Sequence, residues 1–251
     1  MLNYIRSGKG DAVVLQHGLL GGGRYWTPQI THLRRFFDVI TADLPGFAGS
    51  HAEPIPETIA GSSAALMSLL DTLGIKRFSL VGHSMGGMIA QQIALDHQDR
   101  LEKLVLFGTA ASGELPGRFE TLEGSLARLA AHGLDRFARD LAATWFVAGA
   151  QSPYYEFCLE CGKGASAAAA GAAMRAVLSW KAGPGLADVK VPTLVICGDS
   201  DRGTVPDTSF QLWRAIPGAR LSVIPGCAHN AHLESPDLFN RIVGDFLLGR
   251  T

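Results

Sequence analysis

Ser84 lies in Gly82-His83-Ser84-Met85-Gly86, a serine between two glycines in the spacing of a nucleophile elbow. The apolar run 78–81 before it is short, like a buried parallel strand, and 88–95 after it has helical spacing. A strand that turns directly into a helix strains the serine backbone, and the glycines relieve crowding. The free N–H groups at the helix start could then bind an oxyanion. The alternative is a tight turn with an incidental serine. Whether catalytic partners for Ser84 occur later in the sequence decides between these two interpretations.

The partners that a serine nucleophile needs are a base and a group that orients the base. In parallel sheets such residues collect after the carboxyl ends of strands. The apolar run 194–197 is followed by Asp199 and Asp201, and the run 221–224 is followed by His229, with His232 close behind. Serine, aspartate and histidine therefore occur in the chain order that accompanies a nucleophile elbow. The residues alone leave both aspartates as candidates.

An oxyanion hole requires two N–H donors, and one would be the backbone amide of Met85. The second should come from the glycine-rich loop 17–23 that follows the apolar run 12–16. We expect Leu19 to supply it, with Leu20 behind. A glycine-rich loop could instead hold a phosphate group, but the chain has neither a G-x-G-x-x-G pattern nor a Walker lysine.

The elements that must position these residues alternate along the chain. Strands are expected at 12–16, 37–42, 78–81, 104–107, 192–197 and 220–224, and helices at 57–73 and 236–248. Such alternation predicts a mostly parallel sheet with both faces covered by helices. From 112 to 186 only helical stretches occur, at 122–131, 137–146 and the alanine-rich 165–174. The core is therefore expected in two pieces with a helical insertion between them.

Composition describes an ordinary globular chain of 251 residues, 47% hydrophobic and 18% charged, with a formal net charge of −1. Scattered Lys and Arg argue against nucleic acid and anionic membranes as partners. No apolar run reaches the roughly 20 residues of a membrane span, and no signal peptide is visible, so we expect a soluble cytoplasmic protein. The chain is also compatible with a homodimer.

Four cysteines occur, and Cys158 and Cys161 have the C-x-x-C spacing of redox and zinc sites. No second pair stands at metal-ligand spacing, so we expect two neighbouring apolar residues on a helix. No metal is expected, and the remaining thiols, Cys197 and Cys227, suit a reducing compartment.

Together these motifs resemble those of α/β-hydrolase-fold serine hydrolases over essentially the whole chain. The matching segments are His17-Gly18, 43–50, the elbow around Ser84, Gly198-x-x-Asp201 and Gly226-x-x-His229. The resemblance implies Asp201 rather than Asp199 as the acid and His229 rather than His232 as the base. It also implies a core of residues 1–112 and 187–251 with a helical cap at 113–186. Ala48, where the family often has glycine, departs from the pattern in a structural loop.

The activity that this resemblance implies is cleavage of a small or medium ester or lactone, without a metal or organic cofactor. Ser84 excludes the dehalogenases and epoxide hydrolases of this fold, which use aspartate. A C–C hydrolase of aromatic ring-cleavage products, a haloperoxidase-like perhydrolase and a triad-retaining ligand receptor stay as alternatives. The substrate side chains expected from the aromatic composition of the cap and the oxyanion loop are Leu20, Trp145, Phe146 and Trp180, and the cations considered for a substrate carboxylate are Arg24, Arg175 and Lys181. His17 is expected to brace the oxyanion loop, and His83 to pack beside the sheet.

Overall fold

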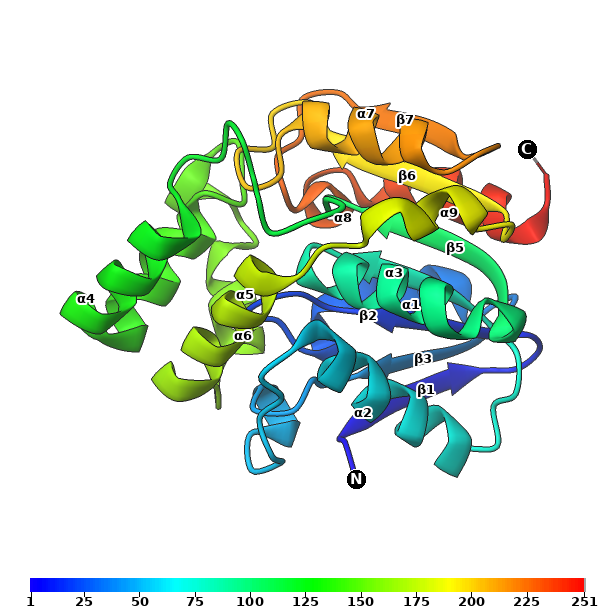
Figure 1. The fold of residues 1–251 in the computed structure, drawn as a ribbon, viewed down its shortest axis with the longest axis horizontal. Coiled ribbons are helices and arrows are strands. Elements are labelled where there is room, and N and C mark those ends of the chain that lie inside the picture. The colour runs from blue at the N-terminus through cyan, green and yellow to red at the C-terminus, as the bar shows by residue number, and fades with distance from the viewer. Residues whose placement is uncertain (251) are drawn as a thin grey trace.

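One seven-stranded sheet forms the centre of the computed structural model, which describes residues 1–250 (Figure 1). In the order in which they lie side by side, the strands are β1 (Tyr4–Gly8), β3 (Asp38–Ala42), β2 (Ala12–Gln16), β4 (Phe78–His83), β5 (Leu101–Phe107), β6 (Thr193–Gly198) and β7 (Arg220–Ile224). Every neighbouring pair is parallel except β1 with β3. This confirms the mostly parallel sheet, and β1 is an addition that the sequence did not predict.

Helices cover both faces of the sheet. Their bounds are α1 (Thr27–Leu33), α2 (Ile59–Thr72), α3 (Met85–His97), α7 (Pro206–Ala215), α8 (Ala231–Glu234) and α9 (Pro236–Leu248), with the short 3-10 helix η1 at Gly23–Trp26. Helices α2 and α3 pack together in front of the sheet in Figure 1, whereas α1 packs against α9. The expected helices at 57–73 and 236–248 are thus present as α2 and α9. Helix α2 begins at the Thr58 cap, whose side chain accepts the Gly61 N–H at 3.0 Å.

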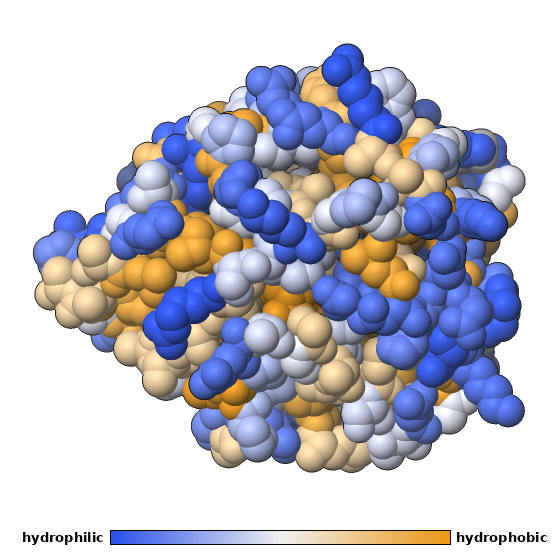
Figure 2. All heavy atoms as spheres, viewed as in Figure 1, coloured by the Kyte–Doolittle hydropathy of each residue, from blue (hydrophilic) through white to orange (hydrophobic). Residues whose placement is uncertain are grey.

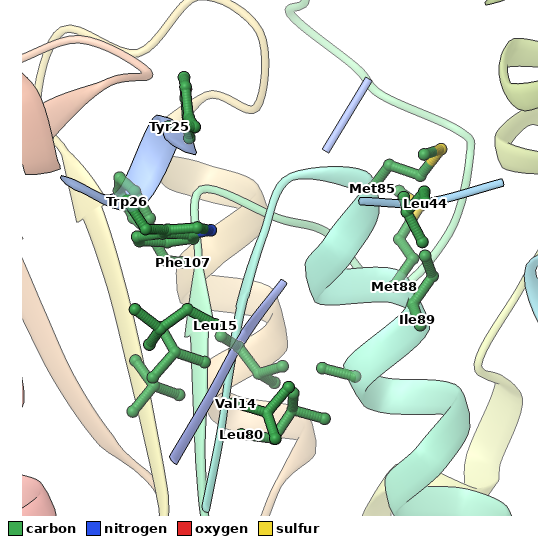
Figure 3. Close-up of a cluster of buried hydrophobic side chains, with 14 of the residues drawn as sticks. Val14, Leu15, Tyr25, Trp26, Leu44, Leu80, Met85, Met88, Ile89 and Phe107 are labelled. Atoms are coloured by element: carbon green, nitrogen blue, oxygen red, sulfur yellow. The ribbon is translucent and has the colours of Figure 1, made fainter. Parts of the chain in front are cut away.

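The core lies between the sheet and these helices. Every residue of β4 and β6 is buried, as expected of central parallel strands. Figure 3 shows Met88 and Ile89 of α3 on one side of the strands, and Trp26 and Phe107 on the other. Apolar packing on both faces holds the strand ends rigidly, which matters because the loops after those ends carry the candidate site.

A helical segment, residues 108–192, joins β5 to β6. It contains α4 (Leu122–Ala143), α5 (Tyr155–Cys161) and α6 (Ala167–Ser179), and ends with the 3-10 helix η5 (Gly183–Asp188). Gly133, with φ of 74°, kinks α4 and separates the two helical stretches expected at 122–131 and 137–146. The alanine-rich stretch lies largely in α6, and α5 was not predicted.

The two ends of the helical segment meet at its base. Ser112 and Lys181 form an isolated antiparallel bridge, and the Ala182 N–H donates to the Ala111 carbonyl at 2.9 Å. Figure 1 shows α4, α5 and α6 projecting from one end of the sheet. The division into a core and a cap at residues 112/113 and 186/187 stays a prediction.

Hydropathy is distributed unevenly over the face seen in Figure 2. Apolar side chains show over α4 and α6, at the left, whereas hydrophilic side chains dominate the opposite end of the view. Within residues 1–250, no helix combines the length and the apolar character that crossing a membrane requires.

Candidate active site

Ser84 occupies the strained turn between β4 and α3. Its φ of 57° and ψ of −121° lie in a region that non-glycine residues rarely adopt. The turn is fixed on both sides, since the Ser84 N–H donates to the Phe107 carbonyl at 2.9 Å and the Thr109 hydroxyl donates to the Ser84 carbonyl at 2.8 Å. A Cβ on Gly82 would overlap the Gly86 carbonyl, so the flanking glycine is required by space. The expected strand–serine–helix turn is present.

His229 and Asp201 meet above the carboxyl ends of β7 and β6. The distance from His229 Nδ1 to Asp201 Oδ2 is 2.8 Å, and both side chains are buried. Asp201 Oδ1 accepts the N–H groups of Gly203 and Thr204 at 2.7 and 3.0 Å, and Oδ2 also accepts the Thr204 hydroxyl at 3.0 Å. These donors fix the carboxylate, which in turn fixes the imidazole. Thr204 is a supporting residue that the sequence did not predict.

Asp199 lies in the same loop and faces a different way. It is exposed, and its Oδ1 accepts the Gly226 N–H and the Ser200 hydroxyl, each at 2.9 Å. The Gly226 hydrogen bond is the largest of the effects that lower the pKa of this carboxyl. Asp201 rather than Asp199 is therefore the carboxylate that reaches His229.

The glycine-rich loop after β2 lies directly against the elbow. A Cβ on Gly18 would be 2.9 Å from Ser84 Cβ and 3.3 Å from the Met85 nitrogen. Leu19 and Met85 line the same cavity as Ser84, and neither backbone N–H has an acceptor within residues 1–250. Two amides without an acceptor therefore belong to the cavity that contains Ser84, and their role as an oxyanion hole stays a prediction.

His17 holds this loop in place, as expected. Its Nε2 accepts the Leu44 N–H at 2.9 Å, which leaves Nδ1 to donate to the Gly18 carbonyl at 2.7 Å. Complete burial lowers the pKa of His17, so the ring remains neutral.

A cavity lies between the elbow and the helical segment, with an empty volume of about 740 Å³ when its mouth is included. Both Ser84 and His229 open into it. Most of its lining is apolar, and the helical segment contributes Leu115, Arg118, Phe119, Leu122, Leu141, Trp145, Ala173, Met174 and Val177. An apolar cavity with a few polar groups at one end is typical of a small-molecule site.

The four side chains expected to contact substrate have different positions. Trp145 lines the cavity, and Leu20 lines a neighbouring hollow together with Trp145. Phe146 and Trp180 line neither: the Phe146 side chain is fully buried in the core, and the Trp180 indole N–H donates to Gln92 Oε1 at 2.8 Å. The expectation for Phe146 and Trp180 is therefore corrected, because aromatic composition does not show which way a ring faces.

The cations considered for a substrate carboxylate also lie elsewhere. Arg24, Arg175 and Lys181 are exposed, and Lys181 pairs with Glu114 at 2.5 Å. Arg118 is the cation that lines the cavity, and it was missed. Its segment has no helical or alternating pattern, so the only signal was its place in the connection after β5, the strand beside the elbow strand.

Two further histidines lie beneath His229. His83 is buried, packs with its ring centroid 4.3 Å from that of Phe107, and makes a hydrogen bond of 3.0 Å from Nε2 to the His229 carbonyl. His232 is also buried, and neither of its ring nitrogens has a partner within residues 1–250. Burial lowers the pKa of both well below the usual value, so both are neutral supports.

The helical segment is tied to the loops that carry Asp201 and His229. The Phe119 N–H donates to the Arg202 carbonyl at 3.0 Å, and the Asn230 N–H donates to the Trp145 carbonyl at 3.0 Å. A third tie joins the Val147 N–H to Glu234 Oε1 at 2.7 Å. The cavity wall and the polar residues at its base are therefore connected through backbone groups.

Cys158 and Cys161 are buried free thiols on α5, one helical turn apart, and Cys158 Sγ accepts a hydrogen bond from Asn230 Nδ2 at 3.5 Å. This is the packing pair that the sequence predicts. Among residues 1–250 no group of three histidine, cysteine or acidic side chains is arranged to hold a metal ion. That the reaction needs no metal or cofactor stays a prediction.

Comparisons with known proteins show which family the fold represents. A family model described as "Alpha/beta hydrolase family" matches residues 12–242. A 2-hydroxy-6-oxo-6-phenylhexa-2,4-dienoate hydrolase from Comamonas testosteroni is 32% identical, over 100% of this chain and 92% of its own. The structure of an enol-lactonase from Burkholderia xenovorans LB400 superimposes with a TM-score of 0.90 at 28% identity, covering 98% of this chain and 96% of the other. A thermophilic esterase from Thermogutta terrifontis has a TM-score of 0.87 at 26% identity, with 99% and 93% covered.

Proposed function

Because the chain belongs to the alpha/beta hydrolase family, we propose that it is a serine hydrolase of small or medium esters or lactones, with Ser84 as the nucleophile. One observation carries the proposal. Ser84 and His229 open into the same apolar cavity, and Asp201 accepts a hydrogen bond from the far side of the imidazole. This arrangement supplies the nucleophile, base and orienting carboxylate of acyl transfer.

The proposed reaction begins at the Ser84 hydroxyl. His229 Nδ1 is bound to Asp201, so Nε2 is the nitrogen that takes the proton as Ser84 Oγ bonds to the carbonyl carbon. The carbonyl oxygen becomes an oxyanion, and the N–H groups of Leu19 and Met85 stabilise it. His229 then donates its proton to the departing oxygen, leaving an acyl group on Ser84.

The second half of the reaction repeats these steps with water. His229 takes a proton from water as the water oxygen bonds to the acyl carbon, and it returns the proton to Ser84 Oγ as the acid departs. Throughout, Asp201 stabilises the charged imidazole, and the four hydrogen bonds that the carboxylate makes hold it in position.

The substrate class follows from the lining and the relatives. An apolar cavity of this size accommodates a small or medium acyl group. The likeness to an enol-lactonase and to an esterase supports C–O bond cleavage. In this proposal residues 113–186 form the cap, since they supply the wall opposite Ser84.

A second candidate is the hydrolysis of a C–C bond next to a ketone. The relative from Comamonas testosteroni, a dienoate hydrolase by name, matches the full length of this chain at 32% identity. The same serine, histidine and oxyanion donors would serve, with carbon in place of oxygen as the departing atom.

The test is a panel of p-nitrophenyl esters, lactones and a 6-oxo-dienoate, assayed on the parent and on Ser84→Ala. Ser68→Ala, in an exposed position on α2, is the matched control. We expect Ser84→Ala to lose activity on every substrate and Ser68→Ala to retain it. A fluorophosphonate should label the parent at Ser84 in peptide mass spectra. Activity of Ser84→Ala equal to that of the parent would overturn the assignment, and the preferred substrate decides between C–O and C–C cleavage.

A further inference from the structure

Arg118 brings a permanent positive charge to a cavity whose lining is mostly apolar. Among the described residues that line the cavity, Arg118 is the only one with a permanent charge, and none of them is an aspartate or a glutamate. Its neighbours on the wall are Leu115, Phe119 and Leu122. Placing a cation among apolar side chains costs free energy unless an anion faces it.

Within residues 1–250 no carboxylate forms a salt bridge with Arg118, although Glu120 lies close enough to affect its pKa. Nη1 donates to the Glu120 carbonyl, to the Thr121 carbonyl at 3.4 Å and to Ser125 Oγ at 3.1 Å. The Glu120 carboxylate lies nearby, but it binds Arg128 at 2.9 Å and the Ser125 hydroxyl at 2.6 Å. Within residues 1–250, Nε and Nη2 of Arg118 have no acceptor, so two donor nitrogens of the guanidinium, with three N–H groups between them, remain free.

The guanidinium is held in place by its surroundings. Its central carbon lies 4.3 Å from the centre of the Phe119 ring, and Nη1 is anchored as described above. Burial lowers the pKa of Arg118, an effect that the nearby Glu120 opposes and Arg128 adds to. The lowering leaves the group charged, because a guanidinium does not deprotonate in proteins.

We propose that Arg118 binds a carboxylate on the substrate, remote from the bond that is cleaved, so that the enzyme selects anionic esters or lactones. The inference rests on the proposed function and names its substrate class. A carboxylate can accept from both free donors at once, which gives a charge-assisted contact with defined direction. Substrate binding would then complete the ion pair that the folded chain leaves open.

The distance between this anion site and the reacting groups is set by the backbone. Phe119 donates its N–H to the Arg202 carbonyl at 3.0 Å, and the next residues, Gly203 and Thr204, hold Asp201. Arg118 therefore sits on the same framework as the His229–Asp201 pair. Arg24, Arg175 and Lys181 have no such connection and lie on the exposed surface.

A purely structural role for Arg118 makes a different prediction. Its bonds to the Glu120 and Thr121 carbonyls support the chain just before α4, and their loss would impair all substrates alike. The informative quantity is therefore the ratio of kcat/KM for an anionic ester to that for its neutral counterpart. A ratio measured on one sample does not depend on how much of the variant is folded.

The substrates are mono-p-nitrophenyl glutarate and the same compound with its free carboxylate methylated. The variants are Arg118→Gln and Arg118→Lys, with Arg175→Gln as a control that removes the same charge from an exposed position outside the cavity. We expect the parent to prefer the anion and Arg118→Gln to lower the ratio about tenfold or more, mainly through KM. Arg118→Lys should keep part of the preference, and Arg175→Gln should keep it all.

Failure of the inference and failure of the proposed function give different results. If Ser84→Ala is inactive and Arg118→Gln changes the ratio by less than about threefold, the hydrolase stands and the anion site is wrong. If Ser84→Ala keeps its activity, the proposed function itself is wrong.

Glutarate gives a readout without turnover: it should raise the Tm of the parent and leave that of Arg118→Gln unchanged. Equal Tm shifts in both would also overturn the inference.

Discussion

The substitution Asp201→Asn changes one atom of a side chain whose every contact is defined. The asparagine oxygen can take the place of Oδ1 and continue to accept the N–H groups of Gly203 and Thr204. The amide nitrogen then replaces Oδ2, 2.8 Å from His229 Nδ1. An amide nitrogen only donates, so Nδ1 must become the acceptor and the proton must move to Nε2. In that tautomer His229 cannot take the proton from Ser84.

The size of the effect follows from this tautomer. Nearly all folded molecules would carry the proton on the wrong nitrogen, and the developing imidazolium would lose its carboxylate partner. We expect kcat to fall about 10³–10⁴-fold, which corresponds to roughly 4–5 kcal/mol in the activation free energy. Stability should change little, because the two backbone donors keep their acceptor and the Thr204 hydroxyl, which now donates to Oδ2, can rotate to accept from the amide nitrogen.

The assay is hydrolysis of a p-nitrophenyl ester, with Tm measured for each variant to verify folding. Asp199→Asn is the control, since Asp199 is exposed and bonds to Ser200 and Gly226 instead. It should stay within about threefold of the parent. A loss of less than about tenfold in Asp201→Asn, or equal losses in both variants, would contradict the role assigned to Asp201.

Four further predictions concern stability, catalysis and the accessibility of the thiols. Burial lowers the pKa of His83 and His232, so in the folded protein these two side chains stay neutral below about pH 6.5, where they take up protons in the unfolded chain. The free energy of unfolding should therefore fall as the pH drops, by up to about 1.4 kcal/mol per pH unit for each residue. His232→Phe removes one of these groups and two unpartnered nitrogens, so urea unfolding at pH 7 should show a gain of about 1 kcal/mol and a shallower pH slope; an unchanged slope would contradict this. Gly18→Ala should lower kcat about 10²-fold or more, because the new methyl would lie 2.9 Å from Ser84 Cβ and displace the oxyanion loop, and unchanged kcat would contradict it. The four thiols are buried, and burial raises the pKa of Cys161 to about 11, so DTNB at pH 8 should react rapidly only after denaturation; fast labelling of the native protein would be the contrary result.

The sequence predicted the elements that carry the candidate site because apolar runs and glycines mark them. The strands before Ser84 and Asp201 are buried throughout, and the edge strand before His229 keeps the apolar residues Leu221, Val223 and Ile224. Because these strands are parallel, their carboxyl ends lie at one edge of the sheet. Strand β1 was missed because it is a half-exposed edge strand. Its residues include Arg6, which pairs with Asp38, so its pattern is not that of a buried strand.

The cavity wall was predicted less well for a different physical reason. The sequence does not distinguish between the aromatic side chains Trp145, Phe146 and Trp180. Packing in the folded protein determines that only Trp145 of these three faces the cavity. Arg118 lies in a connection without regular structure, where no periodicity reports orientation. Local pattern thus indicates which segments form the sheet, whereas the facing of side chains in the helical segment depends on contacts between distant parts of the chain.

The backbone ties between the helical segment and the loops after β6 and β7 restrict how this enzyme could diverge. The segment enters and leaves at one bridge, Ser112 with Lys181, which favours its exchange for another sequence as a unit. However, Phe119 and Trp145 also hold the loops of Asp201 and His229 through main-chain groups. A transplanted segment that lacks these ties would alter the rate of the chemical step together with the choice of substrate. Exchange of this segment would therefore change substrate specificity and turnover together, unless the replacement segment brings the same two backbone partners.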